Sequence, residues 1–181
     1  MVMNVDSLYL RPIEPNDLLW KVYFTLYQNS FPEEERRNEE ELLKTFANPL
    51  FCPHQIIVDQ SFVGLFNYWK FPDFYYIEHF AIIPEIRSNG IGKKIIEEFM
   101  LNKAVVLECE PALDELSLRR LNFYTNLGFF TFPFKYIQPP YSSKKPSIEL
   151  LLLSNSKILS QDFFEQMSAT IANEVYQCNK F

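Results

Sequence analysis

The stretch that decides the fold runs from residue 80 to residue 94 and reads Phe80-Ala81-Ile82-Ile83-Pro84-Glu85-Ile86-Arg87-Ser88-Asn89-Gly90-Ile91-Gly92-Lys93-Lys94. Its first part continues an apolar run that starts at Phe74 and stops at Pro84, as a buried strand would. Its last part begins a segment in which apolar residues recur at helical spacing as far as Met100. Two of the chain's 4 glycines, Gly90 and Gly92, lie between these parts. The stretch therefore predicts a central strand, a glycine loop and a helix.

The glycine loop is suited to binding an anion. Backbone N–H groups in such a loop, together with the positive end of the helix dipole, favour a pyrophosphate. Lys93 and Lys94 add positive charge in the first helical turn, which is unfavourable there unless an anion binds. A tight turn with solvated lysines is the other interpretation, and the loop by itself leaves both open.

Two common phosphate-binding motifs fit the loop poorly. A P-loop would need a glycine at Arg87 and a serine or threonine at Lys94. A dinucleotide-binding fingerprint would need a third glycine at the position of Ile95.

Three short motifs of the chain recur together in one enzyme family. Arg87-x-x-Gly90-x-Gly92 matches the signature Arg/Gln-x-x-Gly-x-Gly/Ala, and the run from Phe80 to Glu85 is similar to Leu-Ala-Val-x-Pro-Glu. The stretch Phe123-Tyr124-Thr125-Asn126-Leu127-Gly128-Phe129 resembles Phe/Leu-Tyr-x-x-x-Gly-Phe. The chain thus resembles the GNAT superfamily of acyl-CoA-dependent N-acyltransferases.

The resemblance extends over residues 62–135 by motif and over residues 8–153 by order of elements. It implies acetyl-CoA as co-substrate, with the pyrophosphate on the loop amides and the pantetheine arm along the central strand. The implied cofactor-binding residues are Ile82, Ile83, Arg87, Asn89, Gly90, Gly92 and Lys93. The chain departs from the family at Ser117 and Arg120, where an asparagine and an alanine are frequent.

The resemblance also directs attention to two catalytic candidates. Tyr124 matches the motif tyrosine, and a phenol of pKa near 10 can donate a proton to a leaving thiolate. Glu78 lies on the central strand and is the candidate base or water-relay anchor, because burial would raise the pKa of its carboxyl group. A Glu78 satisfied by a neighbouring cation is the competing interpretation. His79 is expected on the opposite face as a hydrogen-bonded core histidine.

The predicted function is transfer of an acetyl group from acetyl-CoA to a primary amine by direct attack in a ternary complex. The alternative is a non-catalytic acyl-CoA-binding or sensor module on the same fold. A transferase of aminoacyl or longer acyl groups is a third interpretation. By resemblance, the acceptor pocket is shaped by residues 31–37 and 138–141.

Composition restricts the partners. A net charge of -6 disfavours nucleic acid and anionic membranes, and the longest apolar runs are far short of the roughly 20 residues of a membrane-spanning helix. We expect a cytoplasmic protein with a small-molecule or peptide amine as acceptor, and a homodimer is compatible with the sequence. The 3 cysteines have no metal-binding or nucleophile spacing, so we expect neither a metal nor a thiol intermediate.

The expected fold class is α/β, a mixed and mostly antiparallel sheet of about six to seven strands flanked by helices. A GNAT-like domain is expected over residues 1–154. A C-terminal helical tail over 155–181, capped by Ser160, is expected to pack on the same domain or at an oligomer interface. A second helix should include residues 33–41, with Glu33 and Arg37 paired at i,i+4. Gly128 should end the helix that carries Tyr124.

Overall fold

The computed structural model describes residues 7–177 and divides the chain into two compact units that meet between Leu101 and Asn102. The elements of the first unit are β1 (Tyr9–Pro12), α1 (Trp20–Ser30), the 3-10 turn η2 (Glu33–Glu35), α2 (Glu39–Thr45), β2 (Phe51–Val58), β3 (Ser61–Lys70), β4 (Tyr75–Ile82), the 3-10 turn η3 (Pro84–Ile86) and α3 (Ile91–Met100). Those of the second are β5 (Val105–Cys109), α4 (Glu115–Asn126), β6 (Phe130–Thr131), β7 (Tyr136–Gln138), β8 (Ile148–Ser154) and α5 (Gln161–Glu174).

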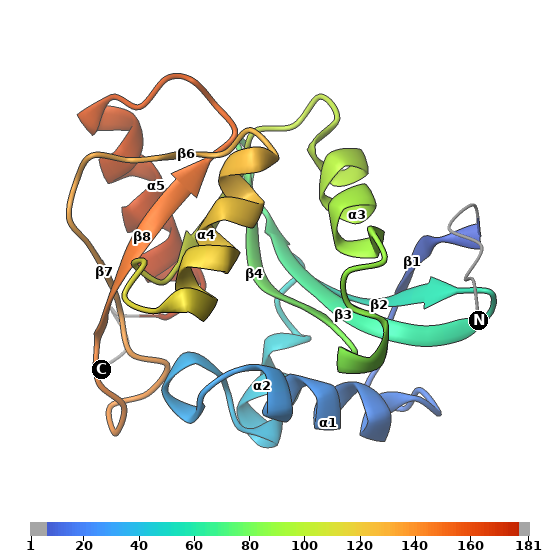
Figure 1. Cartoon of the computed structure of the whole chain (residues 1–181). Helices are drawn as coiled ribbons and strands as arrows, with labels where there is room; N and C mark the ends of the chain where they lie inside the picture. The colour runs from blue at the N-terminus through green and yellow to red at the C-terminus, as the bar shows by residue number, and fades with distance from the viewer. Residues whose placement is uncertain (1–6, 178–181) are drawn as a thin grey trace. The chain divides into compact units, whose positions relative to one another are not determined.

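The strands of the first unit pair antiparallel in the order β1, β2, β3, β4. Asp59 and Gln60 connect β2 to β3 with φ angles of 48° and 63°, as the two central residues of a type I′ hairpin turn require. Helices α1 and α2 lie on one face of these strands and α3 on the other (Figure 1). The predicted central strand is therefore covered on both faces.

The segment after α1 differs from the expected helix. Only residues 33–35 form a 3-10 turn, and Arg36 then adopts an extended conformation. Asn38 is the N-cap of helix α2. Its side chain accepts a hydrogen bond from the Glu41 N–H, while the Glu41 carboxylate accepts one from the Asn38 N–H. This capping box fixes the helix start after Arg37. The predicted single helix over residues 33–41 is therefore wrong, and Glu33 and Arg37 are not one helical turn apart.

A β-bulge interrupts the pairing of β3 with β4. Asn67 is opposite His79, whereas the next residue, Tyr68, is opposite Ile77, so Glu78 is the extra residue of β4. An extra residue shifts the alternation of side chains by one position. Glu78 and His79 consequently face the same side of the strands, toward α1 and α2, and the expectation of opposite faces is wrong.

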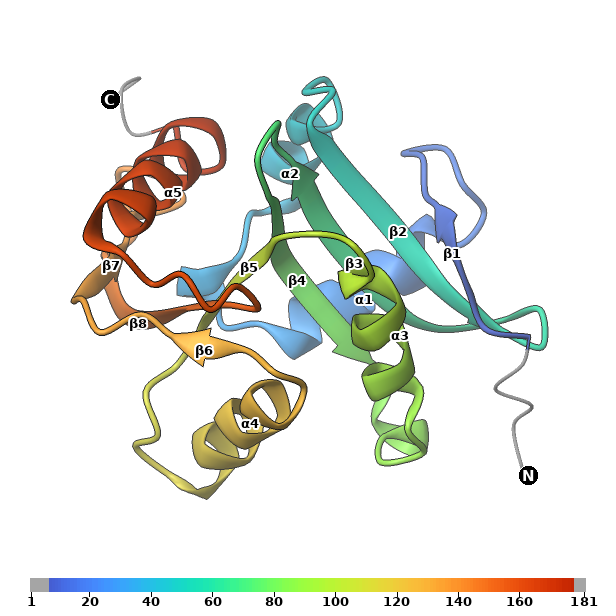
Figure 2. The same cartoon turned by 90° about the horizontal axis from the view of Figure 1, so that it is seen from above.

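In the second unit, β8 pairs antiparallel with β5, β6 and β7. Helices α4 and α5 lie on opposite sides of these strands (Figure 2). Ser160 caps α5 by accepting a hydrogen bond from the Phe163 N–H, and Gly128 adopts φ +90° directly after α4. Both predicted helix boundaries are confirmed. The predicted boundary between residues 154 and 155 stays a prediction, and residues 1–6 and 178–181 lie outside the described part.

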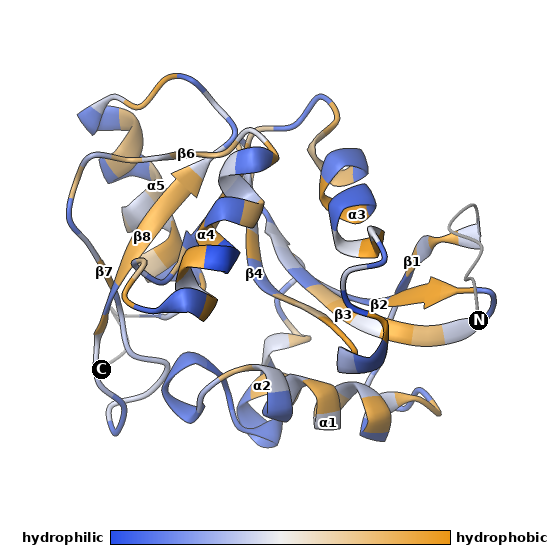
Figure 3. Cartoon of the chain, in the orientation of Figure 1, coloured by the Kyte–Doolittle hydropathy of each residue, from blue (hydrophilic) through white to orange (hydrophobic). Residues whose placement is uncertain are grey.

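The α/β class is confirmed, with eight strands and five α-helices in residues 7–177 rather than the six to seven strands expected. The difference arises because the expected strand after Phe129 is two short strands, β6 and β7. Hydrophobic residues follow β8 along most of its length, whereas α3 alternates hydrophobic and hydrophilic residues (Figure 3).

Gly64 occupies a position on β3 with no room for a side chain. A Cβ atom there would lie 2.4 Å from the carbonyl oxygen of Ala81 and 2.9 Å from Cδ1 of Ile56. We therefore expect Gly64→Ala to lower the free energy of unfolding by about 1–3 kcal/mol, since the neighbouring strand must shift. Urea-induced unfolding measures the change, with Ser61→Ala, at the exposed first residue of β3, as control. Equal stability of Gly64→Ala and the wild type would contradict the close approach.

Candidate active site

The loop between β4 and α3 has the backbone of an anion-binding cradle. Ser88 and Gly90 adopt left-handed conformations, with φ of 69° and 78°, and Gly90 is the N-terminal cap of the ten-residue helix α3. Alternating backbone conformations of this kind turn successive N–H groups toward one side, next to the positive end of the helix dipole. A Cβ at Gly90 would meet no atom within 4 Å, so the space beside the helix end is open. The cradle therefore fits a pyrophosphate.

The side chains around the cradle divide into two groups. The Arg87 Nε–H donates to the carbonyl oxygen of Ile82 at 2.9 Å, so this side chain stabilises the turn itself. Asn89 and Lys93 are exposed, and Lys93 Nζ lies 3.7 Å from Oε1 of Glu97. This weak surface pair leaves the lysine available to a phosphate.

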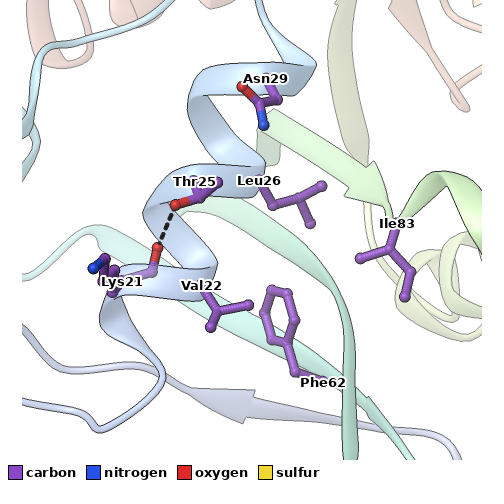
Figure 4. Close-up of a pocket in the computed structure, with 7 residues that line it drawn as sticks. All are labelled: Lys21, Val22, Thr25, Leu26, Asn29, Phe62 and Ile83. Carbon is purple, nitrogen blue, oxygen red and sulfur yellow. Dashed lines mark hydrogen bonds between the residues drawn. The ribbon is translucent and has the colours of Figure 1, made fainter.

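Ile83, the second apolar contact predicted for the cofactor, points toward α1. It lines a pocket of about 360 Å³ between α1 and the ends of β3 and β4 (Figure 4). The other lining residues are Lys21, Val22, Thr25, Leu26, Asn29 and Phe62. The pocket lies on the α1 side of β4, whereas α3, which begins at the cradle, lies on the other face.

Glu78 is buried within a network of donors. Its side chain is 0% exposed, and its carboxylate accepts hydrogen bonds from the Arg37 guanidinium and, at 2.8 Å, from Nε1 of Trp69. Nδ1 of His79 lies 3.7 Å from the same carboxylate oxygen as the Trp69 donor. The neighbouring-cation interpretation of Glu78 is the one that this geometry supports.

This network reverses the expected electrostatics of Glu78. Burial on its own would raise the pKa of the carboxyl group, but the Arg37 charge, followed by His79 and Trp69, lowers the pKa well below its usual range. The prediction of a raised pKa is therefore wrong. The partners were missed because Arg37 precedes Glu78 by 41 residues in the sequence and no local pattern links them.

His79 is a core histidine, as expected. It is 2% exposed, its ring contacts those of Tyr27 and Phe31, and its Nε2–H donates to the carbonyl oxygen of Glu35 at 3.1 Å.

Tyr124 lies in the second unit, on α4. Its ring packs against Phe123 and Phe129, and burial, with a smaller effect of Cys109, raises the pKa of its hydroxyl well above the usual value. Within residues 7–177 this hydroxyl has no hydrogen-bond partner. It is therefore a protonated donor whose proton is not used by the fold.

Ser117, one of the two departures from the family motif, forms a capping box with Asp114, the N-cap of α4. Its N–H donates to the carboxylate of Asp114 at 2.7 Å, and its hydroxyl accepts from the Asp114 N–H at 3.0 Å. Arg120, the other departure, forms an ion pair with Glu110. Both residues thus stabilise the start of α4.

The family model for the GNAT acetyltransferase family matches residues 16–129 of this chain. The chain belongs to the GNAT acetyltransferase family. Its GNAT-like fold is thereby confirmed, and the match includes the strand, the cradle and the Tyr124 motif. Residues 7–177 contain no helix that is long and apolar enough to cross a membrane.

Solved GNAT structures resemble the chain over most of its length. A GNAT-family acetyltransferase from Bacteroides thetaiotaomicron is 31% identical, with 93% of this chain and 98% of that chain covered and a TM-score of 0.86. The ribosomal-protein-S18-alanine N-acetyltransferase from Escherichia coli is 14% identical. The match covers 81% of this chain and 92% of that chain, with a TM-score of 0.58. A GNAT acetyltransferase from Elizabethkingia anophelis, solved with acetyl-CoA bound, is 12% identical. The match covers 82% of this chain and 97% of that chain, with a TM-score of 0.55. No curated protein sequence matches the chain.

Proposed function

We propose that this GNAT protein is an N-acetyltransferase that moves an acetyl group from acetyl-CoA to a primary amine by direct attack in a ternary complex. The cradle formed by Ser88, Gly90 and the start of α3 carries this proposal, because it offers backbone donors to a pyrophosphate. Asn89, Gly92 and Lys93 would complete the binding site. When bound, the co-substrate supplies an acyl group activated as a thioester.

The hydroxyl of Tyr124 fits the role of donor to the leaving sulfur. Because its pKa is raised, the phenol remains protonated near neutral pH. A thiol has a pKa of about 8.5, below that of the phenol, so complete proton transfer to the thiolate is uphill. We therefore expect Tyr124 to stabilise the developing thiolate by a hydrogen bond.

The base role of Glu78 stays a prediction, and its surroundings argue against direct proton transfer. Although burial opposes it, the charge of Arg37, together with the Trp69 hydrogen bond, makes the pKa of Glu78 too low for the carboxylate to hold a proton near neutrality. An alkylammonium group has a pKa of about 10.4 and must lose a proton before attack. We infer that water removes this proton and that Glu78 acts as a fixed charge.

Binding of the co-substrate should stabilise the protein. We expect acetyl-CoA at about 100 times its Kd to raise Tm by about 5 to 10 °C, because it binds only the native state. Thermal unfolding with and without acetyl-CoA measures the shift, and ATP, which lacks the pantetheine arm, is the control. Absence of a shift at millimolar acetyl-CoA would exclude the co-substrate assignment.

Release of the CoA thiol decides between the enzyme and the acyl-CoA sensor. We propose a small-molecule or peptide amine as acceptor, in the cytoplasm, so the assay uses spermidine, an aminoglycoside, free amino acids, a peptide with a free N-terminus and a lysine peptide. Turnover of one amine supports the transferase. Acetyl-CoA binding without turnover of any of these amines would favour the sensor.

A further inference from the structure

The connection between α1 and α2, residues 31–38, is attached to the protein by a buried side chain. Connections of this kind usually lie on the surface with exposed side chains. Here Glu33 and Glu34 are exposed as expected, but Arg37 is only 6% exposed. An arginine is almost never buried without a partner, so the contacts of Arg37 determine how the connection lies.

Three contacts attach the connection to its surroundings within the first unit. The Arg37 guanidinium donates to the Glu78 carboxylate, and the Arg37 N–H donates to the Tyr27 hydroxyl at 2.8 Å. The His79 ring reaches the carbonyl oxygen of Glu35 at 3.1 Å. Two of these contacts end on consecutive residues of β4.

The β-bulge makes this double attachment feasible. In a regular strand Glu78 and His79 would face opposite sides, and only one of them could contact the connection. The extra residue turns both toward α1 and α2. The Trp69 indole, which donates to the second carboxylate oxygen, holds Glu78 from the neighbouring strand.

We propose that Arg37 is a positioning residue that locks the α1–α2 connection onto the bulge of β4, and that this lock sets the affinity for the amine acceptor but not for acetyl-CoA. The inference rests on the proposed function, in which residues 31–37 shape the acceptor pocket. The cradle does not take part in the lock, since α3 lies on the other face of β4.

The variants are chosen so that the protein folds. Arg37→Met by itself leaves a buried charge, whereas Arg37→Met/Glu78→Gln removes both charges and keeps similar volumes. Lys44→Met is the matched control, because Lys44 is an exposed cation of α2 that pairs with Glu40. All three variants are compared with the wild type as full-length protein.

Hydrogen exchange tests the lock without any substrate. In the double variant, peptides containing residues 33–38 should exchange about tenfold faster than in the wild type, since a charge-assisted hydrogen bond is lost. Peptides of α3 should exchange at the wild-type rate in the same sample. Unchanged exchange over residues 33–38 would overturn the lock.

Steady-state kinetics tests its consequence. With the amine that gives the highest turnover in the panel, we expect the acceptor KM of the double variant to rise about tenfold while the KM for acetyl-CoA stays unchanged. Equal increases of both values, or no increase, would overturn the positioning role. If the wild type acetylates no amine, the proposed function fails, and hydrogen exchange still decides whether the lock exists.

Discussion

Replacement of Tyr124 by phenylalanine is expected to lower kcat by about 100-fold or more, the range in which removal of a positioned proton or hydrogen-bond donor lies. The affinity for acetyl-CoA should change little, because the substitution removes one oxygen atom and keeps the ring. The folded structure should also be preserved, since the ring contacts with Phe123 and Phe129 remain and the hydroxyl has no partner within residues 7–177.

Measurement of kcat and of the acetyl-CoA Kd for the same preparation separates the two effects. Tyr9→Phe is the matched control, since Tyr9 is a half-exposed tyrosine of β1 at which loss of the hydroxyl should leave turnover unchanged. A Tyr124→Phe enzyme with wild-type kcat would remove Tyr124 from the reaction. A loss of acetyl-CoA affinity equal to the loss of rate would instead assign Tyr124 to binding.

Features that depend on a few neighbouring residues could be predicted from the sequence. Ser160 caps α5 and Gly128 ends the segment of α4 because each requirement is local, a side-chain acceptor in one case and a left-handed backbone in the other. The cradle was predictable only in part, because Gly90 has one of its two left-handed conformations, whereas Ser88 has the other and Gly92 lies inside α3.

The surroundings of Glu78 could not be predicted, because they depend on two non-local features. The bulge at Glu78 is a property of the pairing between β3 and β4, and the sequence of β4 alone reads as a regular strand. The partner Arg37 comes from a connection that the charge pattern assigned to a helix. Because Arg37 was expected within a helix, it was not identified as the cation beside Glu78. The pKa of Glu78 was therefore expected to rise, whereas Arg37 lowers it.

The ion pair of Arg37 with Glu78 leads to the second prediction, a large loss of stability. Arg37→Met is expected to lower the free energy of unfolding at pH 7 by about 3–5 kcal/mol, the cost of leaving one member of a buried ion pair without its partner. Trp69 still donates to Glu78, but one neutral donor does not replace a guanidinium charge. Urea-induced unfolding measures the loss, and the double variant Arg37→Met/Glu78→Gln should regain most of it.

The pH dependence of the loss tests its electrostatic origin. In the wild type the pKa of Glu78 is lowered, so its contribution is present above the unfolded-state pKa of about 4.3 and is lost as the pH falls toward the folded-state value. Without Arg37, burial dominates and the pKa of Glu78 rises above the unfolded-state value. The neutral carboxyl group then favours the folded state at low pH, and stability falls as the pH rises through the folded-state pKa.

As the pH rises from about 5 to about 7, Arg37→Met should therefore lose stability relative to the wild type, because a raised carboxyl pKa lies in this range. The double variant has no carboxyl group at position 78, so it reports the pH dependence of the rest of the protein. A parallel pH dependence for Arg37→Met and the double variant would mean that Glu78 remains ionised without Arg37. In that case solvent or another cation reaches the carboxylate once the guanidinium is removed, and the fixed charge assigned to Glu78 would not depend on the lock.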